Sequence, residues 1–295
     1  MRYFIIRKNK LRGGSSVIDL HCHTSISDGS VSVDELLFIA KRMGIKNLAI
    51  TDHDTFASAK RGMILGPRYG INVIFGAEFS SFISDLNLEV HILCYMCDFP
   101  DRLEGICLKN STVRKEAHLA LIDQIVKYYP ISLETVSSKA RGSSCIFKSH
   151  IIRSIMDTGF VVPLYSVAYE KLFGENSKIN KVQPKYLDPS EIISQIHQAG
   201  GISILAHPDE YIVNKALPLL MSFGLDGVEA YHPCVKTTLK DRILEISKKY
   251  DLLITGGSDF HGINSSRQRY LGMCSTPDNC FEQLRQRKMK SFKTA

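Results

Sequence analysis

Two histidines spaced two residues apart end the first apolar segment after the amino terminus. Residues 17–29 read Val-Ile-Asp-Leu-His-Cys-His-Thr-Ser-Ile-Ser-Asp-Gly, and the alternating run up to His23 predicts a short strand. Side chains two apart on a strand point to the same side, so His21 and His23 face one way. With Asp28 on a glycine-containing loop, they form half of a metal site. The motif alone leaves open that both histidines line a core face.

Further ionisable side chains follow the other predicted strands, at 47–51, 72–78, 88–95, 202–207, 227–231 and 252–259. Barrel enzymes carry their chemistry at the rim where the strands end. Many histidines and carboxylates without obvious counter-charges need metal ions to satisfy them, and such ligands suit zinc, manganese, iron or cobalt. Nine of these side chains are expected at the rim: His21, His23, Asp28, His53, Glu78, His91, His207, Asp259 and His261.

Helices must alternate with these strands to hold the rim together. The spacing of Ser32 and Glu35 is that of a capping box, and a helix follows up to Gly44. A second helix is expected at 56–69, so residues 17–78 have the β-α-β-α-β order of parallel strands. About nine residues separate 72–78 from 88–95, too few for a helical crossover. The fourth strand is therefore predicted to run antiparallel to the third, which brings Glu78 and His91 to one rim.

The alternation stops near residue 97. Helical stripes at about 103–128, 133–139, 151–158 and 165–173 predict a mostly helical insertion. The strand–helix alternation resumes at Asp188, which is placed to cap a helix beginning with Pro189. We expect residues 16–97 to form the first part of a barrel, 98–186 a helical insertion that caps the substrate site, and 187–295 the second part of the barrel.

Composition sets broad limits on the class of protein. The chain has 295 residues, 44% of them hydrophobic, and a formal charge of +7. It contains no run of about 18 apolar residues and no export signal, so we expect a soluble, cytoplasmic protein without a membrane partner. Eight scattered cysteines fit reduced thiols, and the lone Cys94/Cys97 pair is a weak signal for zinc or redox chemistry. Basic residues gather near both ends, which bears only weakly on anionic partners.

Together the motifs resemble the polymerase and histidinol phosphatase (PHP) family of metal-dependent phosphoesterases. They occur in family order across residues 17–262. The resemblance implies an α/β fold, a distorted (β/α)7 barrel, which agrees with the seven predicted strands. It also implies two to three divalent ions of manganese, iron or zinc. The matching segments are Asp19-Leu-His-Cys-His-Thr24, Asp28-Gly29, Thr51-Asp-His-Asp54, Gly76-Ala-Glu-Phe-Ser80, His91, Ala206-His-Pro208 and Gly257-Ser-Asp-Phe-His261.

The resemblance also implies how the ligands divide. A first ion would be held by His21, His23, Glu78 and Asp259. A second ion would share the bridging Glu78 with His91 and His207. A third ion would be held by Asp28, His53 and His261. Glu78, His207 and Asp259 are accordingly predicted as catalytic residues, in hydrolysis by a hydroxide that bridges the ions. The general acid stays open between His207 and a metal-bound water.

Length and insertion most resemble the bacterial subgroup that acts on nucleoside 3′,5′-bisphosphates and short RNA 5′ ends. The expected partner is a small phosphorylated substrate of the nucleotide class, or a short single-stranded RNA or DNA end. This chain has Lys148-Ser149 where the subgroup carries Arg-Pro before its histidine. The candidate substrate contacts are Lys148, His150, Lys185 and His232, and a surface or packing role stays open for each.

Three other functions stay open at the level of sequence. Histidinol phosphate or a cyclic phosphodiester are alternative substrates for the same chemistry. An amidohydrolase is disfavoured because no lysine ends a predicted strand to serve as a carboxylated bridging ligand. A non-catalytic, metal-stabilised binding module is the alternative of another class, although it would not need so many ligand positions.

Overall fold

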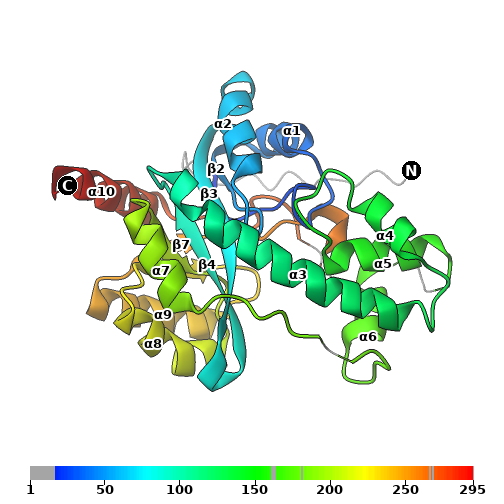
Figure 1. Cartoon of the computed structure of the whole chain (residues 1–295). Coiled ribbons are helices and arrows are strands. Elements are labelled where there is room, and N and C mark those ends of the chain that lie inside the picture. The colour runs from blue at the N-terminus through cyan, green and yellow to red at the C-terminus, as the bar shows by residue number, and fades with distance from the viewer. Residues whose placement is uncertain (1–16, 161–163, 181, 266, 268, 295) are drawn as a thin grey trace.

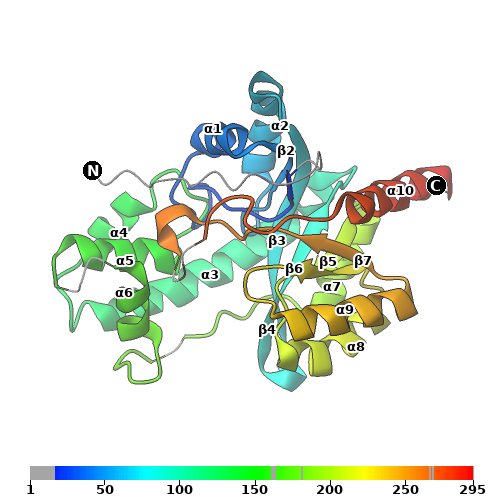
Figure 2. The same ribbon diagram turned by 180° about the vertical axis from the view of Figure 1, so that it is seen from behind.

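The computed structural model describes residues 17–160, 164–180, 182–265, 267 and 269–294. Its centre is one sheet in which the strands are neighbours in chain order. In Figure 1, α1 and α2 lie above this sheet, α7–α9 lie below it, and α3–α6 extend to one side; Figure 2 shows the same arrangement from behind. The seven strands are β1 (Val17–Asp19), β2 (Ile45–Ile50), β3 (Asn72–Ile83), β4 (Leu88–Tyr95), β5 (Ile202–Leu205), β6 (Gly227–Tyr231) and β7 (Leu253–Gly256).

The strand pairing combines two directions. β1, β2 and β3 are parallel, as are β5, β6 and β7, whereas β4 is antiparallel to both β3 and β5. The predicted antiparallel fourth strand is thereby confirmed. The connection is shorter than expected, because β3 continues to Ile83 and only Ser84–Asn87 separate it from β4. Glu78 therefore lies in the middle of β3 and not at its end.

Hydrogen bonds between the segments that follow β1 and β7 close the sheet on itself. Leu20 N donates to Gly256 O at 3.1 Å, and Asp259 N donates to His21 O at 2.8 Å. A Cβ on Gly257 would lie 2.4 Å from the Cβ of His21, so this approach requires glycine. The α/β fold with a distorted seven-stranded barrel agrees with the prediction.

Three strands end at least two residues earlier than the sequence pattern predicts. β1 ends at Asp19, β5 at Leu205 and β7 at Gly256. The residues that follow leave the extended conformation, with φ of 28° at His207 and 49° at Asp259. These bends turn the polar side chains of the rim toward the mouth of the barrel. The alternation of apolar and polar residues along a strand does not predict such bends.

The helices around the sheet are α1 (Val33–Met43), α2 (Ala57–Tyr69), α7 (Pro189–Gln198), α8 (Leu217–Ser222), α9 (Thr237–Tyr250) and α10 (Asp278–Thr294). The capping box of Ser32 and Glu35 is confirmed, and Gly44 ends α1 with φ of 77°. Asp188 caps α7 through a bond from Ser190 N. Among the helices of the described ranges, none combines the length and apolar composition that crossing a membrane requires.

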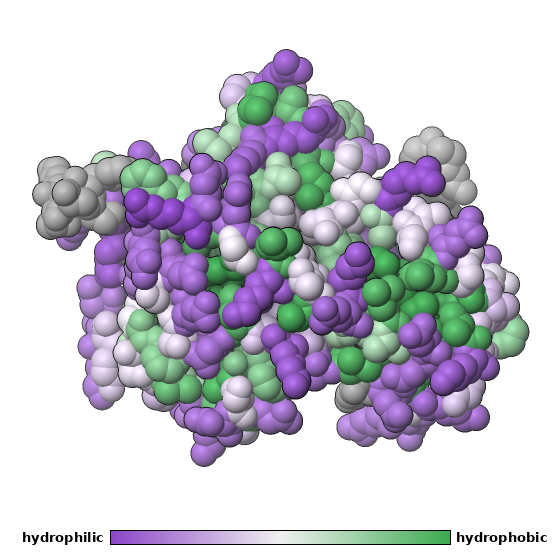
Figure 3. Space-filling view, in the orientation of Figure 1, coloured by the Kyte–Doolittle hydropathy of each residue, from purple (hydrophilic) through white to green (hydrophobic). Residues whose placement is uncertain are grey.

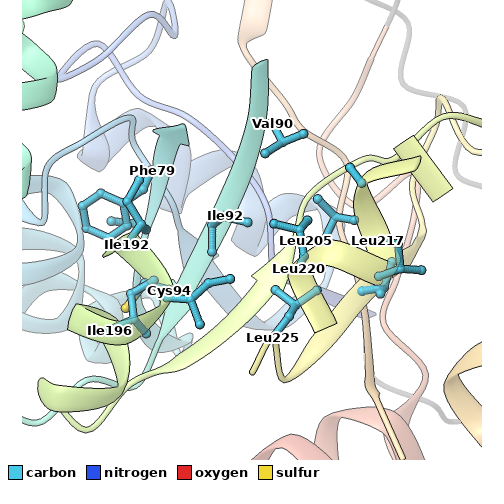
Figure 4. Close-up of a cluster of buried hydrophobic side chains, with 14 of the residues drawn as sticks. Phe79, Val90, Ile92, Cys94, Ile192, Ile196, Leu205, Leu217, Leu220 and Leu225 are labelled. Atoms are coloured by element: carbon cyan, nitrogen blue, oxygen red, sulfur yellow. The ribbon is translucent and has the colours of Figure 1, made fainter. Parts of the chain in front are cut away.

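The largest hydrophobic cluster lies between β3–β5 and the helices α7 and α8. Figure 4 shows Phe79, Ile92 and Cys94 of the strands facing Ile192 and Ile196 of α7. Leu205, Leu217 and Leu220 continue the cluster toward α8, and all of these side chains are buried. Burying one such side chain contributes roughly 1.5–3 kcal/mol, so this face anchors the strands that carry Glu78 and His91.

A helical region follows β4, consisting of α3 (Glu104–Ile125), α4 (Leu133–Lys139), α5 (Lys148–Asp157) and α6 (Tyr165–Phe173). It has a hydrophobic cluster of its own, which includes Leu121, Ile125, Val136, Ile151 and Leu172. Ser144 N donates to Ile26 O at 2.8 Å, so this region also touches the loop after β1. The division of the chain into a barrel and an insertion at residues 98–186 stays a prediction.

Candidate metal centre

The nine predicted ligands converge at one end of the barrel, in overlapping groups. Within each group, one ligand atom from each residue lies within 4.8 Å of the others. His21, His23, His53 and Glu78 each belong to two groups, which makes the whole set continuous. The groups are His23–Asp28–His53–His261, His21–His23–Asp259, His21–Glu78–His207 and His53–Glu78–His91.

Glu78 is the shared member, and its carboxylate faces five histidines. Its Oε1 lies 3.0 Å from His91 Nδ1 and 3.0 Å from His207 Nε2. Its Oε2 lies 3.2 Å from His23 Nε2, 3.2 Å from His53 Nδ1 and 3.4 Å from His21 Nε2. The two oxygens therefore address different sets of histidines, as a bridging carboxylate would.

Two further carboxylates lie on either side of His23. Asp28 Oδ2 is 3.3 Å from His261 Nε2 and 3.8 Å from His53 Nε2, and Asp28 Oδ1 is 3.7 Å from His23 Nδ1. Asp259 Oδ1 is 3.4 Å from His23 Nε2 and 3.6 Å from His21 Nε2. His23 thus lies in both outer groups, whereas the resemblance placed it with the first ion only.

Several ring nitrogens in this cluster are buried without a hydrogen-bond partner among the described residues. They are His21 Nε2, both ring nitrogens of His23 and His53 Nδ1. A buried polar atom without a partner carries a free-energy cost, which a coordinated cation removes. Histidine nitrogens and carboxylate oxygens are ligands that zinc, manganese and iron accept. The residues fit a centre of two to three divalent ions, and the number and identity of the ions remain a prediction.

The histidines of the cluster lower the pKa values of two of its buried carboxylates, Glu78 and Asp259. Burial alone would raise the pKa of Glu78, but His21, His53 and His91 hold that pKa well below its usual range. Burial likewise opposes ionisation of Asp259, yet His261 and His21 hold its pKa well below the usual range. Both carboxylates are therefore ionised, the state in which a carboxylate binds a metal ion.

Depth differs among the ligands. His21, His23 and Glu78 are at most 1% exposed, whereas the side chains of His91 and His207 are 20% and 26% exposed. The deep residues form a floor, and the more exposed histidines lie at the mouth. His91, His207 and Asp28, whose side chain is 21% exposed, are therefore the ligands nearest to solvent.

The helical region contacts this mouth. The ring of Phe147, just before α5, stacks on that of His53 at a centroid distance of 5.9 Å. Arg114 of α3 forms an ion pair with Asp54 at 2.6 Å, and Asn110 Nδ2 donates to the same carboxylate at 2.7 Å. Asp54 adopts φ of 51°, so these bonds hold a strained residue next to His53.

The four predicted substrate contacts lie at different places. His232 is buried, and its Nε2 lies 3.4 Å from Asp259 Oδ2. His150 is buried and accepts a bond from Phe147 N at 3.0 Å. Lys148 lies 5.5 Å from the ring centre of Phe173, and Lys185 is exposed. The roles of all four stay predictions.

Sequence reasoning missed the residues behind the ligands. Glu229 of β6 contacts His21, Glu89 contacts His91 and Arg269 contacts Asp259. One signal was available for Glu229, because it is a charge in an otherwise apolar predicted strand. No pattern marks Glu89 or Arg269, since exposed-looking charges are common beside strands and in loops.

Comparison with known proteins gives the same family as the motifs. The model of the PHP domain matches residues 19–222. A phosphoribosyl 1,2-cyclic phosphate 1,2-diphosphodiesterase of Eggerthella lenta is 32% identical and covers 83% of this chain and 94% of its own. A 5′-3′ exoribonuclease of Escherichia coli is 28% identical, covering 83% and 85%, and a 3′,5′-nucleoside bisphosphate phosphatase of Chromobacterium violaceum is 25% identical, covering 83% and 87%.

A solved structure gives the same result for the fold. A protein of Bifidobacterium adolescentis described as a metal-dependent phosphoesterase superposes with a TM-score of 0.84 at 25% identity, covering 92% of this chain and 96% of its own. The matched span contains seven of the nine predicted ligands together with the strands that precede or carry them. The chain belongs to the PHP domain family and is a metal-dependent phosphoesterase.

Proposed function

We propose that this enzyme hydrolyses a phosphate ester of a small nucleotide-like substrate. The candidates are the 3′-phosphate of a nucleoside 3′,5′-bisphosphate and the 5′ end of a short RNA. The observation that carries this proposal is the convergence of nine histidine, aspartate and glutamate side chains around Glu78. The names of the relatives share a ribose that carries phosphate, which supports a substrate of that class.

Each part of the site has a task in this reaction. Divalent ions held by the nine ligands would supply Lewis acidity and lower the pKa of water toward neutrality. Glu78 would fix the spacing between ligand groups, and Asp259 would align His21 and His23 from the opposite side. His207 would complete the ligand set at the more exposed side of the site through its Nε2.

The helical region would supply substrate contacts. His150 and Lys148 lie at the start of α5, beside the Phe147 ring that stacks on His53. A cationic or hydrogen-bonding group there would hold a second phosphate, while the first is at the metal centre. Binding both ends would favour substrates with two anionic groups over simple monoesters.

The test is a substrate panel with manganese-loaded protein. We expect phosphate release from adenosine 3′,5′-bisphosphate, or mononucleotide release from a 5′-phosphorylated RNA trimer, to exceed hydrolysis of histidinol phosphate by at least about 100-fold, the scale of about 2.7 kcal/mol of transition-state binding. Equal rates on all three substrates would contradict a nucleotide-directed site. No turnover on any phosphoester would favour the binding-module alternative.

A cyclic phosphodiester of a phosphorylated sugar is the second candidate. The relative with that printed activity is 32% identical, against 25% for the bisphosphate phosphatase. The Lys148-Ser149 pair also departs from the Arg-Pro of the bisphosphate-directed subgroup. Opening of phosphoribosyl 1,2-cyclic phosphate, with silence on adenosine 3′,5′-bisphosphate and the RNA trimer, would replace the first candidate by the second.

A further inference from the structure

A carboxylate that is not among the predicted ligands lies directly behind the metal cluster. Glu229 is the central residue of β6 and is 0% exposed. Its neighbours Val228 and Ala230 point to the opposite face, into the main hydrophobic cluster. A buried glutamate is costly unless its oxygens are fully bonded, so its partners indicate its role.

The first partner of Glu229 is the ring of His21. His21 Nδ1 lies 3.1 Å from Glu229 Oε1 and 3.2 Å from Oε2. An ionised carboxylate can only accept, so Nδ1 must carry the proton. The other ring nitrogen, Nε2, has no hydrogen-bond partner among the described residues and faces Glu78 and Asp259 at 3.4 and 3.6 Å.

The second partner is the backbone of His207. His207 N donates to Glu229 Oε2 at 2.8 Å. This residue has φ of 28°, a conformation that L-amino acids adopt at a cost. The bond holds the bend that turns His207 Nε2 toward Glu78 Oε1, 3.0 Å away.

Other histidines of the cluster are held from behind in different ways. His261 Nδ1 donates to the carbonyl oxygen of Asp259 at 2.9 Å, and His91 Nε2 lies 3.2 Å from Glu89 Oε1. Glu89 is about a third exposed, whereas Glu229 is fully buried and contacts two ligands that follow separate strands, β1 and β5. Among these supporting residues, Glu229 is therefore the one that contacts two ligands, His21 and His207.

We propose that Glu229 is a positioning residue: it fixes His21 as the Nδ1–H tautomer and holds the bent backbone of His207, so that both histidines offer Nε2 to metal. This inference rests on the proposed metal centre and is independent of the substrate. Carboxylates behind ligand histidines generally act in this way, and their loss costs about 10–100-fold in metal affinity or activity.

The main experiment compares Glu229→Gln with Glu245→Gln, the same change at an exposed position of α9. The amide keeps only one accepting oxygen and loses the negative charge, so the bonds to the His21 ring and to the His207 backbone are weakened. We expect the dissociation constant for Zn²⁺, measured by competition with a chromophoric chelator, to rise about 10–100-fold in Glu229→Gln. Glu245→Gln should match the parent. An unchanged constant in a folded Glu229→Gln protein would overturn the proposal.

A double-variant comparison separates positioning from simple stabilisation. If Glu229 acts through His21, then Glu229→Gln should weaken Zn²⁺ binding far less in a His21→Gln background than in the parent. Full additivity of the two effects would mean that Glu229 does not act through His21. Such additivity would also contradict the proposal.

A measurement on the unaltered protein covers the case in which Glu229→Gln does not fold. Side-chain ¹⁵N spectra of the diamagnetic Zn²⁺-loaded enzyme report the tautomer of each histidine, and His21→Gln identifies the His21 signals. We expect Nδ1–H for His21. The Nε2–H tautomer would overturn the proposal. Because neither readout involves turnover, an inactive substrate panel would leave this inference intact.

Discussion

At the scale of single residues, Glu78 is the side chain on which the centre depends most. It is 1% exposed and faces five histidines from four segments of the chain. Its two oxygens contact different histidine sets, so one residue joins the ligand groups. A neutral replacement would keep the shape and remove the charge.

We expect Glu78→Gln to abolish measurable turnover, a loss of at least about 1,000-fold, because the ligand groups lose their shared anion. Metal content after dialysis against Mn²⁺ should fall in parallel. Elemental analysis and phosphate release measure the two effects, and Glu245→Gln is the control for loss of one glutamate charge. Near-normal activity with full metal content would contradict the bridging role.

His118 of α3 is a buried histidine outside the ligand set. Its Nδ1 donates to the carbonyl oxygen of Ile146. Burial lowers the pKa of His118 to about 4, although the Ile146 bond opposes that shift and Arg114 and Lys148 add to it. The ordinary histidine pKa is about 6.5, so the unfolded chain binds an extra proton between about pH 6.5 and 4. Stability linked to His118 is complete above this window and is lost as the pH falls through it.

We expect His118→Asn, which keeps a donor for Ile146, to flatten the pH dependence of the unfolding free energy in that window. The change in slope approaches about 1.4 kcal/mol per pH unit. Urea unfolding of metal-free protein at several pH values measures it, since metal binding would add its own pH dependence. Parallel curves for parent and variant would show that His118 does not titrate as its environment implies.

At the scale of elements, the connection between α3 and the loop after β2 organises the mouth of the site. Arg114 is 3% exposed, pairs with Asp54 and donates to Ser80 Oγ at 2.7 Å. Its guanidinium lies 4.8 Å from the ring centre of Phe147 and 5.0 Å from that of Tyr186. One side chain therefore joins α3, the start of α5, β3 and the segment that returns to the barrel.

Arg114→Met should lower the unfolding free energy by about 3–5 kcal/mol, because Asp54 is left as a buried charge without its partner. Arg61→Met is the matched control. Its pair with Asp34 at 2.6 Å is about half exposed on both sides, so the loss should stay below about 1 kcal/mol. Urea unfolding measures both, and equal losses would show that burial of the Arg114 pair does not matter.

At the scale of the whole molecule, the ion site joins the two ends of the barrel sheet. Ligands come from the segments after β1 and β7 and from β3 and β4, so bound ions would cross-link strands far apart in the sequence. Figure 3 shows hydrophobic side chains gathered on the surface of the helical region, over α3 and its neighbours. Exposed apolar residues there include Val126, Tyr128, Leu133, Leu164 and Val167.

Because ions bind the folded centre and not the dispersed ligands, chelation should lower the midpoint of thermal unfolding. An ion present at 100 times its dissociation constant contributes about 2.7 kcal/mol. Differential scanning calorimetry with and without a chelator measures the shift, and Glu78→Gln should respond less than the parent. The same midpoint in chelator and in excess Mn²⁺ would argue against a metal centre that spans the barrel.

The sequence by itself determined the family, the strand order and the set of candidate ligands. The reason is that these signals depend only on residues close together in the sequence. They are the H-x-H and D-x-H spacings, capping boxes such as Ser32–Glu35 and the short connection between β3 and β4. The direction of β4 followed from chain length alone, since no helical crossover fits in the nine residues between the predicted strands 72–78 and 88–95.

Only the tertiary structure decided how the ligands group and what holds them. His23 belongs to two groups, and Glu229 meets His21 across 208 residues of sequence. Arg114 meets Asp54 from the helical region. Such contacts depend on closure of the barrel and on bends at His207 and Asp259, which arise from packing and hydrogen bonds among distant strands. No pattern in neighbouring residues encodes them.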